Sequence, residues 1–175
     1  MNYFTHSPLY RFSEMRTNTA HIEQLWQQEN TQTYLISDLQ SLVVNDGEGF
    51  VAATIGADRR DAFTEFARVR LYLGSAGGVP YFVLGFEGVH EKIEALLEEA
   101  QQFIDLRKVA LDLPQEQSAI LAYARGIVHW NLRHQHCPDC GQLTHSLEAG
   151  HVRQCSSESC GKAHYPRTDT AVIVL

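Results

Sequence analysis

Four cysteines at metal-ligand spacing form the most informative pattern in the sequence. Two residues separate Cys137 from Cys140, four separate Cys155 from Cys160, and a 14-residue spacer lies between the pairs. Zinc prefers tetrahedral thiolate coordination in structural sites, and each close ligand pair comes from a tight turn. A glycine follows each pair and can adopt the positive φ that such a turn needs. We therefore predict a zinc ribbon in which these four cysteines hold one structural Zn²⁺ ion.

Disulfide bonds and a redox dithiol are the two other uses open to these cysteines. The N-terminus lacks a charged start followed by a long apolar core, so no secretion signal points to an oxidising compartment. No thioredoxin-like strand precedes Cys137, which weighs against a redox role. Four thiolates complete a coordination shell, so the nearby histidines are expected on the surface or beside a ligand: His134, His136, His145, His151 and His164. A closed shell leaves no position for water, so the ribbon itself predicts no hydrolysis.

Composition narrows the class of protein. The chain has 175 residues, of which 44% are hydrophobic and 20% charged, as in a globular protein with room for one ordinary domain and a small metal-bound one. No apolar run approaches the length that crosses a bilayer, so we expect no membrane partner and a cytoplasmic location. The net charge of −7 disfavours a general nucleic-acid-binding surface, which needs Lys and Arg.

Hydrophobic periodicity predicts an α+β domain ahead of the cysteines. Helical spacing of apolar residues marks three helices, and a shorter one fits 58–67. The expected helices span 19–29, 91–103 and 114–133, and the expected strands span 33–36, 41–44, 50–54, 70–74 and 81–85. A further strand is expected over 150–154, leading into the second cysteine pair. The glutamates of 91–103 are expected on a solvated face, with a catalytic role as the alternative.

The sequence that follows the cysteines resembles a known family. Residues 164–175 read HYPRTDTAVIVL, so a cysteine ribbon runs directly into a Tyr-Pro-Arg-x-Asp segment and an apolar strand. This arrangement resembles the NADH pyrophosphatases of the Nudix hydrolase superfamily, the NudC-like group. LRKV at 106–109 and AYAR at 122–125, with Trp130 after it, are similar to the same family. The resemblance is specific from about residue 104 onward.

The resemblance implies a three-part enzyme. Residues 1–132 would form a degenerate Nudix-like α+β domain, 133–165 the zinc ribbon, and 166–175 the start of a catalytic Nudix domain. Family members cleave the pyrophosphate of NAD(H) into nicotinamide mononucleotide and AMP, with Mg²⁺ or Mn²⁺ held by the glutamates of a Nudix box. We accordingly expect NAD(H) or a related dinucleotide as substrate, a homodimer, and NAD-capped RNA as the only nucleic acid ligand.

Two substrate-binding residues carry over by motif. Arg107 matches a family arginine implicated in substrate binding, and a guanidinium suits a phosphate oxygen. The alternative is a salt bridge with Asp105 or Asp112. Tyr165 matches an aromatic residue that contacts the nucleotide in the family's dimer, where a ring could stack on a base. The alternative is that Tyr165 packs the ribbon against the next domain.

The catalytic box itself has no match in the chain. Gly88 and Glu94 have the Gly-x5-Glu spacing, but Gln102 and Phe103 stand where Arg-Glu is required. We therefore predict no catalytic residue and interpret the chain as the N-terminal part of a longer enzyme. By itself it would be inactive and would supply dimer contacts and part of the substrate pocket. The alternative function is a zinc-ribbon module that binds nucleic acid or protein.

Overall fold

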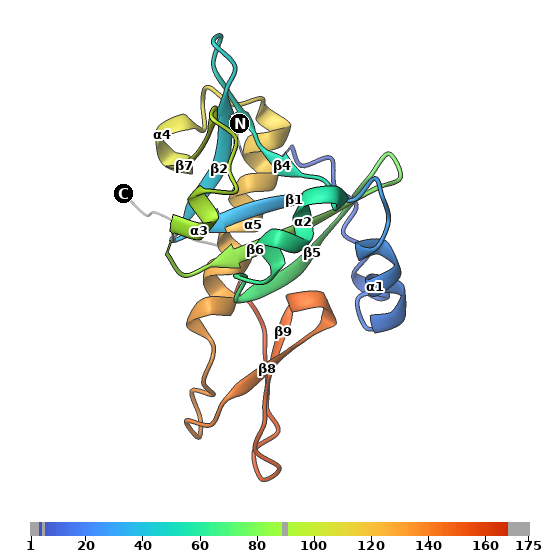
Figure 1. Cartoon of the computed structure of the whole chain (residues 1–175). Coiled ribbons are helices and arrows are strands. Elements are labelled where there is room, and N and C mark those ends of the chain that lie inside the picture. Colours follow the sequence, from blue (N-terminus) through green and yellow to red (C-terminus); the bar gives the residue numbers. More distant parts are fainter. Residues whose placement is uncertain (1–3, 5, 89–90, 168–175) are drawn as a thin grey trace, which may run out of the picture.

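A mixed β-sheet forms the centre of the chain. The computed structural model describes residues 4, 6–88 and 91–167 (Figure 1). The sheet has the order β3-β2-β1-β6-β5, with β4 paired to β1 and β7 paired to β2. Its strands are β1 (Gln32–Ser37), β2 (Gln40–Asn45), β3 (Phe50–Ala52), β4 (Thr54–Ile55), β5 (Val69–Ala76), β6 (Val79–Phe86) and β7 (Gln101–Asp105). The strands expected from alternation are all present, and the predicted α+β class is confirmed.

The first hairpin is splayed, and the next segment inserts into it. Asp38 and Leu39 form the turn between β1 and β2, both with positive φ. Only two residue pairs next to that turn join the two strands. Beyond them, β3 pairs with β2 and β4 pairs with β1, so one continuous segment bridges both strands. The strand expected over 50–54 therefore exists, but it changes partner at Ala53.

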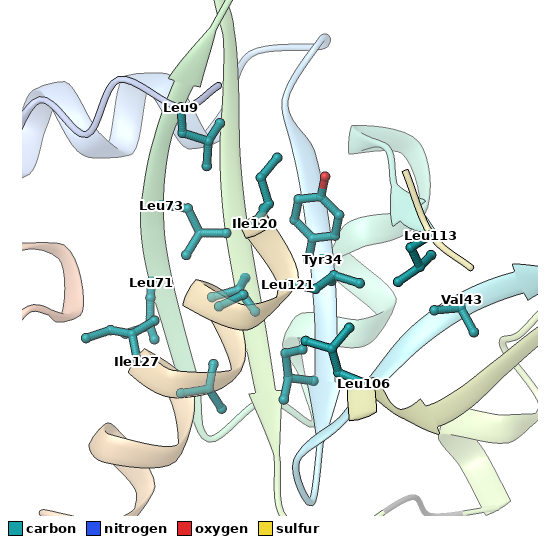
Figure 2. Close-up of a cluster of buried hydrophobic side chains, with 14 of the residues drawn as sticks. Leu9, Tyr34, Val43, Leu71, Leu73, Leu106, Leu113, Ile120, Leu121 and Ile127 are labelled. Carbon is teal, nitrogen blue, oxygen red and sulfur yellow. The ribbon is translucent and has the colours of Figure 1, made fainter. Parts of the chain in front are cut away.

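One face of the sheet packs against the long helix α5 (Gln115–Arg133) and the short helix α4 (Leu106–Val109). Figure 2 shows side chains of the strands reaching toward α5, with Leu71 beside Ile127. The apolar stripe of α5 explains this packing, because residues three and four apart share one side of a helix. Its buried apolar members are Ala119, Ile120, Leu121, Ala124, Ile127 and Val128. Pro114 caps the helix from outside, so α5 begins at Gln115, one residue after the predicted start.

The opposite face is covered by three helices, which gives an α/β/α arrangement (Figure 1). They are α1 (Thr19–Trp26), α2 (Ala57–Thr64) and α3 (Glu91–Glu94). Successive residues of β6 divide between the two cores: Phe82 lies in this second core and Val83 in the first. The ring of Trp26 meets Phe82 edge-on, with 5.0 Å between centroids. The sheet is thus buried on both faces.

The helix expected over 91–103 is wrong beyond its first turn. Only Glu91–Glu94 is helical, and β7 begins at Gln101. Five residue pairs join β7 to β2, so tertiary pairing outweighs the local helical pattern. Arg59 holds the intervening loop: it pairs with the Glu98 carboxylate, and its Nη2 donates to the Leu96 carbonyl at 2.6 Å.

Close packing of α5 on the sheet predicts a cost for any side chain at Gly85. A Cβ there would lie 2.5 Å from Val128 Cγ1 and 2.6 Å from Val69 Cγ2. We expect Gly85→Ala to lower the free energy of unfolding by about 1–3 kcal/mol through overpacking. The matched control is Gly126→Ala on α5, where a Cβ meets nothing within 4 Å. That change should raise stability by about 0.5–1 kcal/mol. Urea denaturation measures both, and equal effects would contradict the packing account.

Candidate metal centre

The four cysteines meet in a small three-stranded sheet after α5, drawn below the main sheet in Figure 1. Its strands are β8 (Thr144–Leu147), β9 (Val152–Cys155) and β10 (Ala163–His164), in the order β10-β9-β8. The strand expected before the second cysteine pair is β9. A 3-10 turn, η3 (Glu148–Gly150), joins β8 to β9. The β8–β9 hairpin places Cys155 opposite Thr144 and fixes the second pair against the first.

The four thiols are placed as ligands of a single ion would be. All four Sγ atoms lie within 4.8 Å of one another. The Sγ atoms of Cys137 and Cys160 are 3.8 Å apart, and those of Cys140 and Cys155 are 3.4 Å apart. Tetrahedral Zn–S bonds of about 2.3 Å place two sulfurs about 3.8 Å apart. All four cysteines are free thiols, so the disulfide alternative has no support in the structure.

Backbone hydrogen bonds shape both cysteine turns in the same way. The Cys137 N–H donates to the Gln142 carbonyl at 2.7 Å, and the Cys155 N–H donates to the Lys162 carbonyl at 2.9 Å. Glycine follows each pair with φ of 77° at Gly141 and 56° at Gly161, which confirms the expected positive φ. Each turn therefore folds back on itself and aims two sulfurs into one space.

The electrostatics of the cluster favour a cation. Burial raises the pKa of the Cys137 thiol. Hydrogen bonds from the N–H groups of Asp139 and Cys140 and from the His164 side chain lower it by more, so the pKa falls to about 6. At Cys140 the Gln142 N–H lowers the pKa, yet the neighbouring Cys155 thiol and burial raise it overall. Thiols this close cannot all ionise without a positive charge between them. One divalent cation would supply that charge.

The histidines do not all lie where they were expected. His164 lies beside a cysteine, with Nε2 3.4 Å from Cys137 Sγ, and His145 is exposed. His164 also forms a second group of possible ligands with Cys137 and Asp139. The expectation for His151 is wrong: it is only 9% exposed, and its recorded bonds are to Tyr123 and Glu148 rather than to a cysteine.

His151 belongs to a polar junction between the ribbon and α5. The Tyr123 hydroxyl donates to His151 Nε2 at 2.5 Å, while His151 Nδ1 donates to the Glu148 carbonyl at 3.2 Å. Buried Asn131 donates from Nδ2 to the Gly150 carbonyl at 2.7 Å. These partners are far apart in the sequence, so sequence reasoning missed them. The available signal was Asn131 itself, a polar residue on the apolar stripe of α5.

The two residues assigned to substrate lie outside the cysteine cluster. Arg107 makes the salt bridge that was its alternative role: Nη2 lies 2.6 Å from Asp105 Oδ2. This contact, together with the Arg107 backbone N–H, holds the pKa of the Asp105 carboxyl far below its usual value. The Arg107 side chain remains 79% exposed, and Tyr165, directly after β10, is 61% exposed. Both can still meet a ligand.

Two family models match consecutive parts of the chain. The first is described as an NADH pyrophosphatase-like rudimentary NUDIX domain and matches residues 30–130. The second is an NADH pyrophosphatase zinc ribbon domain and matches residues 132–165. The chain belongs to the NADH pyrophosphatase-like family of the Nudix superfamily. The suspected resemblance is thereby confirmed, while the boundaries at 132/133 and 165/166 stay predictions.

Curated relatives of this Nudix chain carry related names. It is 27% identical to the human NAD-capped RNA hydrolase NUDT12 over 99% of its own length and 45% of the relative. Nudix hydrolase 19, chloroplastic, from Arabidopsis thaliana is 40% identical over 42% of the chain and 18% of the relative. NAD-capped RNA hydrolase NudC from Stutzerimonas stutzeri is 30% identical over 59% of the chain and 34% of the relative. The chain thus spans less than half the length of these relatives.

The residues that partly match a Nudix box in the sequence lie on different elements of the rudimentary Nudix domain. Gly88 lies in the bend after β6, Glu94 ends α3, and Gln102 and Phe103 lie in β7. A Nudix box needs its carboxylates on one helix, and these positions do not share one. Asp169 and the apolar run 171–175 lie outside the described residues.

No helix in the described part of the chain has the length and apolar character to span a membrane.

Burial of His151 predicts a loss of stability on acidification. Burial and the charges of Arg16 and Arg11 lower its pKa from 6.5 to about 4, although the Glu148 and Ala149 carbonyls oppose this. The unfolded chain therefore binds the proton first, and stability falls as the pH drops from 6.5 toward 4. We expect a loss of about 2 kcal/mol between pH 7 and pH 5.

Comparison with His151→Gln isolates this contribution, because both proteins keep the same cysteines. Urea unfolding of the zinc-loaded proteins at each pH gives the difference in slope. An equally steep decline in the variant would show that other groups, such as the thiols, cause the acid sensitivity.

Proposed function

We propose that this chain is the N-terminal and zinc-ribbon part of a Nudix hydrolase that cleaves the pyrophosphate of NAD(H) into nicotinamide mononucleotide and AMP. The observation that carries the proposal is the direct succession of the two NADH pyrophosphatase-type domains, packed together through α5. The catalytic glutamates and their Mg²⁺ or Mn²⁺ would belong to a Nudix domain following residue 165. The 175-residue chain alone would then be inactive.

Cys137, Cys140, Cys155 and Cys160 are proposed to bind one structural Zn²⁺ ion. The sulfur separations and the matched turns support this ligand set. Four protein ligands close the coordination sphere, so the ion stabilises the ribbon and activates no water. The free thiols also suit the reducing cytoplasm, which we keep as the proposed compartment.

Arg107 and Tyr165 are proposed to contact the dinucleotide. Asp105 binds Arg107 through Nε and Nη2, which orients the guanidinium and leaves most of it exposed toward a phosphate. An exposed ring at Tyr165 suits stacking on a base, within a homodimer that brings it to the partner's pocket. Several relatives are named NAD-capped RNA hydrolases, and with a net charge of −7 we expect contacts confined to such a cap.

Zinc loading tests the ligand assignment directly. Elemental analysis of the purified chain should find about one zinc per chain, because a site of four thiolates holds a single ion. Cys155→Ser should lower that content and unfold the ribbon, since zinc binding and ribbon folding share the same free energy. His145→Gln, a change at an exposed residue of β8, should leave the zinc content unchanged. Full zinc content in Cys155→Ser would refute the assignment.

Activity is tested in two proteins, the 175-residue chain and a longer one in which a catalytic Nudix domain follows it. With NADH and Mg²⁺, only the longer protein should release nicotinamide mononucleotide and AMP. In that protein Tyr165→Ala should raise KM about tenfold, which corresponds to about 1.4 kcal/mol, whereas Tyr165→Phe should stay near wild type because stacking needs only the ring.

The matched pair for Arg107 is Arg107→Ala and Arg68→Ala. Only Arg107→Ala should raise KM, because Arg107 is the arginine proposed to contact the dinucleotide. Arg68 is a matched control, since it is also an exposed arginine in an ion pair, with Glu87 at 3.2 Å. Hydrolysis of NADH by the 175-residue chain at enzyme-like rates would overturn the division of roles. If light scattering gave the longer protein the molar mass of a monomer, the homodimer would be removed from the proposal.

A further inference from the structure

A cavity of about 460 Å³ lies between α1, the main sheet and the η3 turn of the ribbon. Arg16 and Thr19 border it from the N-terminal side, Arg70 and Phe82 from the sheet, and Ser146 from the ribbon. Neither Arg107, Tyr165 nor any cysteine lines it. Its size lies within the range of small-ligand sites, about 300–1,000 Å³.

Arg16 carries a buried positive charge that no carboxylate neutralises within the described residues. The residue is 9% exposed, and its Nε is buried without a hydrogen-bond partner. Its Nη2 donates to the Arg11 carbonyl at 3.1 Å, and the guanidinium also lies near the Tyr123 hydroxyl. Both neighbours are neutral. A buried charge without a counter-ion is costly because it has lost its hydration. An anion in the cavity would therefore offset the desolvation cost of the Arg16 guanidinium.

The other charged groups of the cavity wall leave this charge uncompensated. Arg70 pairs with Glu23 at 2.7 Å and is therefore already balanced. Glu148 also borders the cavity, but it forms no ion pair with Arg16. Its carboxylate would disfavour an anion at the η3 side, so the anionic group of a ligand belongs at the Arg16 side.

The remaining wall offers free hydroxyls and an apolar surface. The side chains of Thr17, Thr19 and Ser146 border the cavity and have no recorded hydrogen bond within the described part of the chain. Ile22 and Leu147, which is 40% exposed, provide the apolar surface. A ligand with an anionic group, hydroxyl partners and a flat apolar ring would satisfy all three parts.

We propose that this cavity binds a nucleoside monophosphate, with the phosphate beside Arg16 and the base against Ile22 and Leu147. The site is separate from the dinucleotide site proposed above and does not depend on it. Because its wall joins α1, the sheet and η3, an occupant would hold the ribbon against the first domain.

The test titrates AMP into the zinc-loaded 175-residue chain and follows amide signals by ¹⁵N NMR. We expect saturable shifts at Thr17, Thr19, Ser146 and Ala149, and at least a tenfold weaker affinity in Arg16→Gln. Arg68→Gln removes an exposed arginine outside the cavity and should bind AMP as the wild type does. Inorganic phosphate should shift the same signals more weakly, since it lacks the base.

A second pair of variants keeps the test valid if Arg16→Gln fails to fold. Ser146→Leu fills the cavity from the ribbon side and should abolish AMP binding, whereas His145→Leu, the neighbouring exposed position on β8, should not. Absence of saturable binding, shifts confined to Arg107 and Tyr165, or equal affinity in Ser146→Leu would each overturn the proposal. If the longer protein bound AMP in this cavity but did not hydrolyse NADH, the proposed activity would fail and the AMP site would stand.

Discussion

The amide of Asn131 lies where α5 leaves the sheet and the ribbon returns to it. It donates to the Ile127 carbonyl within its own helix and to the Gly150 carbonyl of η3. Both acceptors are remote from water, and an unpaired backbone carbonyl at Gly150 would cost about 1–3 kcal/mol. Gly150 itself has φ of 95° and abuts the Leu71 side chain, so only a glycine permits this approach. This small contact is one of those that set the orientation of the ribbon relative to the sheet, together with the Tyr123–His151 hydrogen bond.

The cysteine cluster depends on that orientation only indirectly. Its geometry is local, since each turn is closed by backbone hydrogen bonds and each ends in a glycine with positive φ. The hairpin between the turns makes the connection to α5. Buried Arg153 donates to the Thr144 carbonyl at 2.7 Å and to Gln135 Oε1 at 3.2 Å, which ties β8 and β9 to the segment that follows α5. Metal binding and docking are therefore coupled through β8 and β9.

Local signals in the sequence were sufficient for much of the structure. Apolar alternation identified β1, β2, β5 and β6, and cysteine spacing with glycine identified the ribbon. The helix over 91–103 failed because the pairing of β7 with β2 is a long-range contact that no local pattern encodes. His151 was misplaced for the same reason, as its partner Tyr123 lies 28 residues away. The roles of Arg107 and Tyr165 came from motif alone, and the structure adds only their surroundings.

The parallel pairing of β1 with β6 bears on how the chain is made. Residues 32–37 find their parallel partner only at 81–86, and the first core closes only with α5, which ends at residue 133. Contacts this distant in sequence form slowly and late. During synthesis the side of the sheet that faces α5 therefore stays uncovered until α5 has emerged from the ribosome. The ribbon, translated after α5, then finds its docking surface already formed.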